Sequence, residues 1–130
     1  MEKLIHQVML AVNERDFDAL DELPFHPEFE FHSLFSVSEG TTLAGVDGLR
    51  QWAADVDAIW DDFHVVIEEV RMADEDTAVL CLHLTGRARA SGVPLDQRTG
   101  QVWTRRDGLL HRNVGYPTPR EALEACGLAY

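Results

Sequence analysis

Apolar residues near the start of the chain recur every three or four positions, as one face of an α-helix requires: Ile5, Val8, Met9 and Val12. Asp16 is placed to cap a second, short helical segment, which Pro24 ends. Across residues 29–35 the period changes to two, with phenylalanine or Ser33 at alternate positions. The pattern predicts a helix, a helical turn and then a first strand.

A second helical pattern begins at Gly45 and again carries apolar residues at intervals of three or four: Val46, Leu49, Trp52, Val56, Ile59 and Trp60. Four segments rich in β-forming residues follow, separated by turn sequences: 63–70, 77–90, 93–106 and 109–116. They predict an antiparallel meander. Thr118 and Glu121 then form a capping box with Pro119 at the first helical position, and Gly127 is placed to end this last short helix.

The composition is that of one globular domain, which we place at residues 1–130 because no linker or repeat interrupts the pattern. Hydrophobic residues make up 45% of the chain and charged residues 26%, and no apolar run approaches the roughly 20 residues of a membrane-spanning helix. The N-terminal residues lack the pattern of a signal peptide. We therefore expect a cytoplasmic protein without membrane contact.

The net charge and the spacing of cysteine and histidine indicate which classes of partner to expect. A net charge of −12 argues against nucleic acid, because binding a polyanion requires a concentrated basic surface. Cys81 and Cys126 have neither the spacing nor the neighbours of a metal or redox motif, so we expect free thiols. Four histidines show no metal-ligand spacing either: His32, His64, His83 and His111. The sequence thus predicts no metal and no cofactor.

The order of predicted elements and five stretches of sequence resemble the SnoaL-like branch of the nuclear-transport-factor-2-like superfamily. These stretches are residues 26–33, 45–49, 91–93, 102–110 and 116–128. The resemblance covers nearly the whole chain and implies an α+β, cone-shaped fold, in which a curved antiparallel sheet packs against N-terminal helices around an internal pocket. Relatives include polyketide cyclases, ketosteroid isomerase, dehydratases and epoxide hydrolases, so the resemblance specifies a fold better than a reaction.

Strand register decides which side chains share a face. If residues 90–92 and 106–108 are both three-residue hairpin loops, Gln101 lies between Cys81 and Asn113. One face of the sheet then carries Val79, Cys81, His83, Thr99, Gln101, Trp103, His111 and Asn113. The reverse face carries Leu80, Leu82, Leu84, Val102, Thr104, Leu110, Arg112 and Val114.

Two assignments of these faces remain open. Periodicity alone buries the leucine-rich face under the helices and leaves the polar face in water. The resemblance implies the opposite, because the pocket positions of ketosteroid isomerase and the cyclases correspond to Ser33, His83, Gln101, Trp103 and Asn113. The leucine-rich face would then need a cover, and relatives commonly supply it by forming a homodimer through the sheet.

The catalytic groups of these relatives are not all present. The carboxylate of the cyclases and the isomerase corresponds to Gln101, which cannot titrate near neutral pH. The base of the isomerase corresponds to Ser33, and its tyrosine to Val8. Neither mechanism carries over, and His83 remains as the candidate catalytic residue for proton transfer, with a structural role as its alternative. His32 and His111 are lesser possibilities for the same role.

Two functions are consistent with this pattern. The first is a cofactor-independent cyclase, isomerase or lyase that acts on a small, partly apolar carbonyl substrate. The alternative is a dimeric module that binds a small organic ligand without converting it. In either case the candidate ligand-binding residues are the same: Phe31, Ser33, Trp60, Gln101, Trp103, His111 and Asn113. The two tryptophans either stack on a flat ligand or belong to the core.

Overall fold

The computed structural model of the chain describes residues 1–32 and 43–130. Its elements, in chain order, are α1 (Glu2–Glu14), α2 (Phe17–Asp21), β1 (Phe25–His32), β2 (Leu43–Ala44), α3 (Gly45–Ile59), β3 (Trp60–Asp74), β4 (Thr77–Ala88), β5 (Pro94–Arg106), β6 (Leu109–Tyr116) and α4 (Pro119–Ala125). Every predicted helix and strand is confirmed. The part of the first predicted strand that includes Ser33 lies outside the described residues.

The predicted capping residues act as helix ends. The Asp16 side chain accepts a hydrogen bond from the Ala19 backbone N–H at the start of α2. Thr118 does the same for the Glu121 N–H at the start of α4, with Pro119 in the first turn. None of the helices in the two described ranges is long and apolar enough to cross a membrane.

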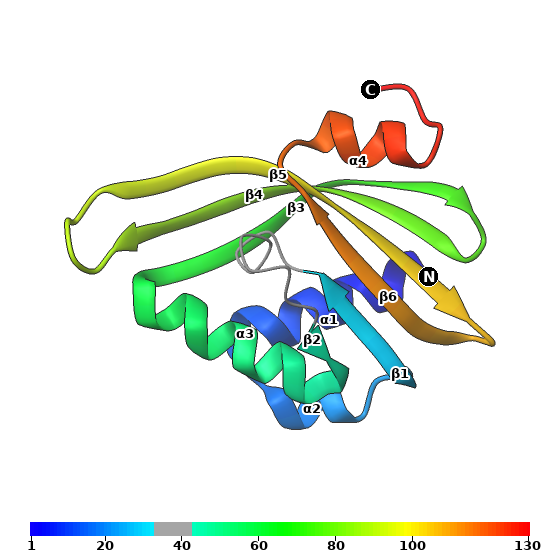
Figure 1. Cartoon of the computed structure of the whole chain (residues 1–130), viewed down its shortest axis with the longest axis horizontal. Coiled ribbons are helices and arrows are strands. Elements are labelled where there is room, and N and C mark those ends of the chain that lie inside the picture. The colour runs from blue at the N-terminus through cyan, green and yellow to red at the C-terminus, as the bar shows by residue number, and fades with distance from the viewer. Residues whose placement is uncertain (33–42) are drawn as a thin grey trace.

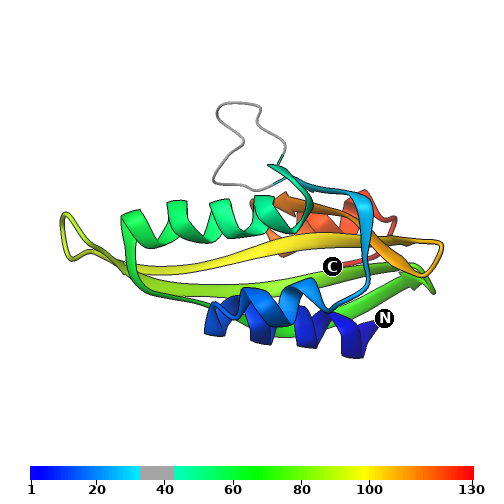
Figure 2. The same ribbon diagram turned by 90° about the horizontal axis from the view of Figure 1, so that it is seen from below.

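The strands form one six-stranded sheet in the order β2-β1-β6-β5-β4-β3. β1 runs parallel to β6, and the other neighbouring strands are antiparallel. Figure 1 shows α1, α2 and α3 on one side of this curved sheet, which we call the inner face, and α4 on the opposite, outer face. In Figure 2 both α1 and α3 extend along the strands on the inner side.

The main core lies between the inner face and α1 to α3. It contains Phe29, Leu80, Trp103 and Leu110, each at most 1% exposed. A smaller cluster lies between the outer face and α4. It joins the sheet residues Val79, Cys81 and Val102 to Ala122 and Leu123 of α4. Both faces of the central strands are therefore covered, by different helices.

The hairpin registers differ from the prediction. β4 and β5 pair with Leu80 opposite Gln101, one residue away from the predicted partner Cys81. The β5–β6 turn has two central residues rather than three, because Asp107 and Gly108 both have positive φ, as a type I′ turn requires. A bulge between Thr104 and Arg105 shifts the pairing again, so Trp103 lies opposite Asn113.

A one-residue slip exchanges the two faces of a strand, and this slip turns β4 over relative to β5. Leu80, Leu82 and Leu84 lie on the inner face with Gln101 and Trp103, whereas the intervening residues of β4 face outward. Both predicted face sets are thus wrong. The three leucines are at most 4% exposed within the chain, so they cannot form the proposed dimer surface. The homodimer itself stays a prediction.

Candidate ligand pocket

A cavity of about 40 Å³ lies between the inner face of the sheet and helices α1 and α3. It exceeds the roughly 10–15 Å³ that one water molecule needs. Most of its wall is apolar, and helices α1 and α3 and strands β1, β3, β4, β5 and β6 contribute to it. The apolar lining residues are Val8, Met9, Val12, Phe31, Leu49, Trp52, Phe63, Val65, Leu84 and Trp103.

Two polar side chains in this wall have no hydrogen-bond partner in the described part of the chain. Asn113 is only 1% exposed, and both its Nδ2 and its Oδ1 are unpaired. The indole Nε1 of Trp52 is also buried and unpaired. An unpaired buried amide or N–H costs about 1–3 kcal/mol. The cavity therefore offers two donor groups and one acceptor that the described residues leave without a partner.

Gln101 has a different role in the wall. Its Oε1 accepts a hydrogen bond of 2.9 Å from the Trp103 Nε1. Trp103 also stacks on Phe29, with 5.9 Å between the ring centroids. The amide therefore satisfies the indole N–H and holds the ring in place, a positioning role that does not require a titrating group.

One titratable side chain, His32, lines the cavity among the described residues. Its Nε2 lies 3.1 Å from Glu30 Oε2. The pKa of Glu30 is lowered, first by this hydrogen bond and then by the charges of His32, Arg112 and His111. Glu30 is therefore an ionised partner that can orient the imidazole.

The structure brings together four of the predicted ligand-binding residues and separates the others. Phe31, Gln101, Trp103 and Asn113 all line the cavity. Trp60 is half-buried against the edge of the core, the structural alternative given above, and lies outside the lining. His111 also lies outside it, beside β1. Ser33 is not among the described residues.

His83 lies on the outer face of the sheet, and this corrects its predicted position beside Gln101. Its register partner is Arg98, and its Nε2 lies 2.5 Å from Asp96 Oδ1. The neighbouring Cys81 lies in the cluster under α4, and burial raises the pKa of its thiol. The sheet separates His83 from the cavity. The predicted catalytic role rested on His83 and Gln101 sharing one face of the sheet, and in the structure they lie on opposite faces.

Trp52 was missed as a site residue, and His32 was given only as a lesser possibility for proton transfer. Helical spacing already placed Trp52 on the apolar face of its helix, but no local pattern indicates that its N–H stays unpaired. His32 follows Phe31 in a strand that alternates, so periodicity assigns it to the outer side. Its place at the end of β1 nevertheless brings it into the cavity wall.

The comparisons with known proteins agree with this architecture. A model of the SnoaL-like domain matches residues 5–113. The chain belongs to the SnoaL-like family. The matched range contains most of α1 and all of α2 and α3, and it ends at Asn113. It therefore includes nearly all of the cavity wall of this SnoaL-like protein. No curated protein matches the chain.

Solved structures share the fold. A protein with a ketosteroid isomerase-like fold from Catenulispora acidiphila, in complex with trimethylamine, gives a TM-score of 0.73 at 18% identity, covering 96% of this chain and 92% of the other. A protein named as a SnoaL-like polyketide cyclase from Jannaschia gives 0.70 at 20% identity, covering 88% and 82%. TerC, co-crystallised with polyporic acid, gives 0.74 at 19% identity, covering 96% of each chain. These likenesses establish the nuclear-transport-factor-2-like fold and not a reaction.

Proposed function

We propose that this SnoaL-like protein binds a compact, uncharged organic ligand in the cavity between the inner face and α1 and α3. The observation that carries the proposal is the buried, unpaired carboxamide of Asn113 in an apolar wall. Leaving such a group unpaired costs free energy, and a bound partner recovers it. This function corresponds to the binding module rather than to the enzyme among the two predicted alternatives.

The unpaired atoms specify the ligand. Asn113 Nδ2 and Trp52 Nε1 can each donate a hydrogen bond, and Asn113 Oδ1 can accept one. A complementary ligand carries a carbonyl beside an N–H or O–H on a small apolar frame. Anions are disfavoured by the net charge of −12 and by the apolar wall. Two neighbours in fold were crystallised with small ligands, trimethylamine and polyporic acid, which supports a pocket for small molecules in such folds.

The test uses 2-pyridone, a ring with adjacent carbonyl and N–H, and N-methyl-2-pyridone, which lacks the donor. We expect calorimetry to show that the wild type binds 2-pyridone at least tenfold more tightly, because only it can satisfy Asn113 Oδ1. Asn113→Leu should abolish that preference. Its free energy of unfolding should be at least that of the wild type, because the variant removes unpaired polar atoms from an apolar site.

The matched control is Gln7→Leu, the same kind of exchange at an exposed position of α1. It should leave both affinities unchanged. Equal affinity of the wild type for the two pyridones, or no binding of either at millimolar concentration, would contradict the proposal. A loss of stability in Asn113→Leu would show that the amide has a structural role instead.

The second candidate function is proton transfer on a carbonyl ligand, and the pairing of His32 with Glu30 favours it. A carboxylate that contacts one ring nitrogen of a histidine fixes the orientation of the imidazole. His32 lies in the cavity wall, where such a group could reach a ligand. The residue-scale prediction in the Discussion separates this function from binding alone.

A homodimer and a cytoplasmic location remain predictions of ours for this protein. Of the exposed apolar residues, Val66 lies in β3 opposite His83 and is 41% exposed, so it is a candidate contact on the outer face. The leucines that first motivated the dimer are buried in the core. Any self-association therefore needs a surface other than the one predicted.

A further inference from the structure

We propose that His26, Glu28 and His111 form a binding site for a divalent transition metal ion, with Zn²⁺ as the ion of reference. One ligand atom from each residue lies within 4.8 Å of those of the other two. Both histidines are half-buried, and Glu28 is exposed. Two imidazoles and one carboxylate form a donor set that suits zinc, copper, nickel and iron better than magnesium or calcium.

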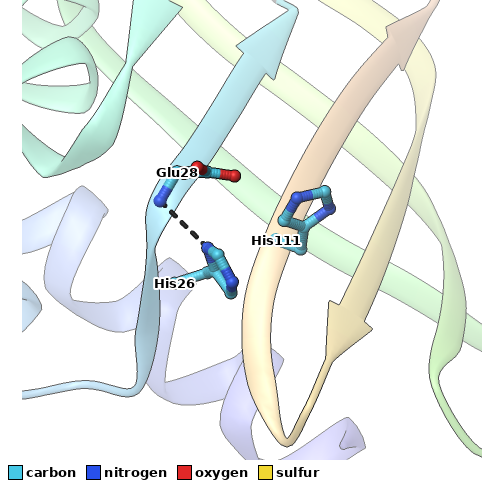
Figure 3. Close-up of side chains that lie close together, drawn as sticks. All are labelled: His26, Glu28 and His111. Atoms are coloured by element: carbon cyan, nitrogen blue, oxygen red, sulfur yellow. Dashed lines mark hydrogen bonds between the residues drawn. The ribbon is translucent and has the colours of Figure 1, made fainter.

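The parallel pairing of β1 with β6 brings these residues together. Residues 26 and 111 are far apart in the chain, yet Phe25 pairs with Leu110 and Glu30 with Arg112. The register shifts between those two pairs, in the segment that carries His26 and Glu28. Figure 3 shows His26 and Glu28 on β1 and His111 on the neighbouring strand β6.

A second irregularity involves His111 itself. β5 pairs Thr104 with Arg112 and Arg105 with Leu110, so His111 is the extra residue of a bulge in β6. Bulges redirect side chains, and they are common beside functional sites. The strand pairing is therefore irregular in both strands that supply the proposed ligands, β1 and β6, and in each strand it is irregular at the ligand residues.

The present distances are compatible with coordination after small rotations. Zinc lies about 2.0–2.2 Å from histidine nitrogen and carboxylate oxygen, so donors around one ion lie about 3–3.5 Å apart. The His26 and His111 rings already meet edge to face, with centroids 5.0 Å apart. Because Glu28 is exposed, its side chain can move toward the rings without disturbing the core.

Metal binding would change one existing contact. His26 Nδ1 now accepts a hydrogen bond of 2.9 Å from the Glu28 backbone N–H, which places the proton of a neutral ring on Nε2. A metal on Nδ1 replaces that contact, and a metal on Nε2 moves the proton to Nδ1. Either way, the Glu28 N–H loses its acceptor. The Glu28 amide is therefore a built-in reporter of coordination.

The charges around the trio favour a cation. Glu30 adds a second carboxylate on β1, and it lies close enough to His111 for the two side chains to interact electrostatically. Arg112 opposes a cation, but its Nε lies 3.9 Å from Glu30 Oε2 and is partly neutralised there. None of His26, Glu28 and His111 lines the cavity around Asn113, so the site is separate from the proposed ligand pocket.

The experiment titrates Zn²⁺ into the full chain by calorimetry at about pH 7.5 in a buffer that does not chelate metals. We expect one zinc ion per chain. His26→Gln, Glu28→Gln and His111→Gln should each weaken affinity at least tenfold, as loss of one ligand requires. The control variants His6→Gln and His64→Gln replace exposed histidines elsewhere and should bind within about twofold of the wild type.

A further measurement tests the assignment. Zinc should shift the backbone amide resonance of Glu28 in a ¹H–¹⁵N spectrum, because coordination removes the acceptor of this N–H. Unchanged zinc affinity in the three ligand variants would overturn the proposal, as would control variants that lose affinity equally. Absence of zinc binding by the wild type at millimolar concentration would also overturn it. A far-UV circular dichroism spectrum confirms that each variant is folded.

Discussion

Gln101 illustrates how a side chain can keep its place in a pocket and change its role. The family resemblance aligns it with a catalytic carboxylate, and in the structure it lines the cavity. Its Oε1, however, is used by the Trp103 indole. The residue therefore shapes the wall, and any acid or base chemistry in this cavity has to come from another side chain, of which His32 is the candidate.

At the scale of the residue, proton transfer makes a measurable prediction about His32. If the cavity converts a carbonyl ligand, the wild type should exchange the hydrogens next to the carbonyl of cyclohexanone with deuterium from solvent. His32→Gln should lower that rate by about 10²–10⁴-fold, the usual contribution of one general acid or base. His83→Gln, a change on the outer face, is the matched control and should retain the wild-type rate. Equal rates in wild type and His32→Gln would leave binding as the function.

Among the elements, α4 depends on a contact that no capping pattern indicates. Its start lies directly over Gly100 of β5. A Cβ built on Gly100 would be 2.5 Å from the Ala122 Cβ and 3.0 Å from the Thr118 carbonyl oxygen. Real Cβ atoms do not approach that closely, so only glycine lets α4 pack on the outer face at this distance.

The element-scale prediction is that Gly100→Ala loosens α4. We expect the free energy of unfolding in urea to fall by about 1–3 kcal/mol, the cost of overpacking a well-packed site. Ala122→Gly should cost about 1 kcal/mol alone, through helix propensity. Because it removes the clashing methyl group, the double variant should be more stable than the sum of the two single effects predicts. Strict additivity would show that the two positions do not touch.

At the scale of the whole molecule, Arg15 connects three elements. It ends α1 with a φ of 55°, and its Nη1 donates to the Val12 carbonyl. Its Nε and Nη2 donate to the two carboxylate oxygens of Asp57 in α3, at 2.9 and 2.7 Å. Nη2 also reaches the Phe63 carbonyl of β3 at 3.4 Å. This bidentate pair holds the two long helices of the inner side together.

The pair makes stability depend on pH. The hydrogen bond from Arg15 lowers the pKa of Asp57 in the folded protein. Asp57 thus contributes stability above its unfolded pKa of about 3.9, and this is lost as pH falls through the lower folded value. In urea unfolding, Asp57→Asn should cost about 0.5–1 kcal/mol at pH 7, a modest value because the pair is partly exposed.

As the pH is lowered toward about 2.5, the difference between Asp57→Asn and the wild type should shrink, since protonation of the wild-type carboxyl removes the ion pair. Asp55→Asn, on the same helix and bonded only to Gln51 among the contacts described, is the control and should be close to neutral at both pH values. A cost of Asp57→Asn that is the same at both pH values would show that the ion pair contributes nothing.

The sequence by itself determined the local elements of this protein. Helical spacing from Ile5 to Val12, alternation from Phe29, and the capping residues Asp16 and Thr118 each act within a few residues of the chain. Their physical causes are backbone geometry and nearby hydrogen bonds, so they can be read without knowledge of distant contacts. The order of these local elements along the chain is enough to identify the fold.

Only the tertiary structure decided which side chains meet. The length of one turn and a single bulge fix the register, and one residue of slip moves a side chain to the other face, as it does for His83. Parallel pairing of β1 with β6 places His26 beside His111, although nothing near either residue indicates the other. The unpaired state of Asn113 likewise depends on every neighbour in three dimensions, which is why no local pattern could predict it.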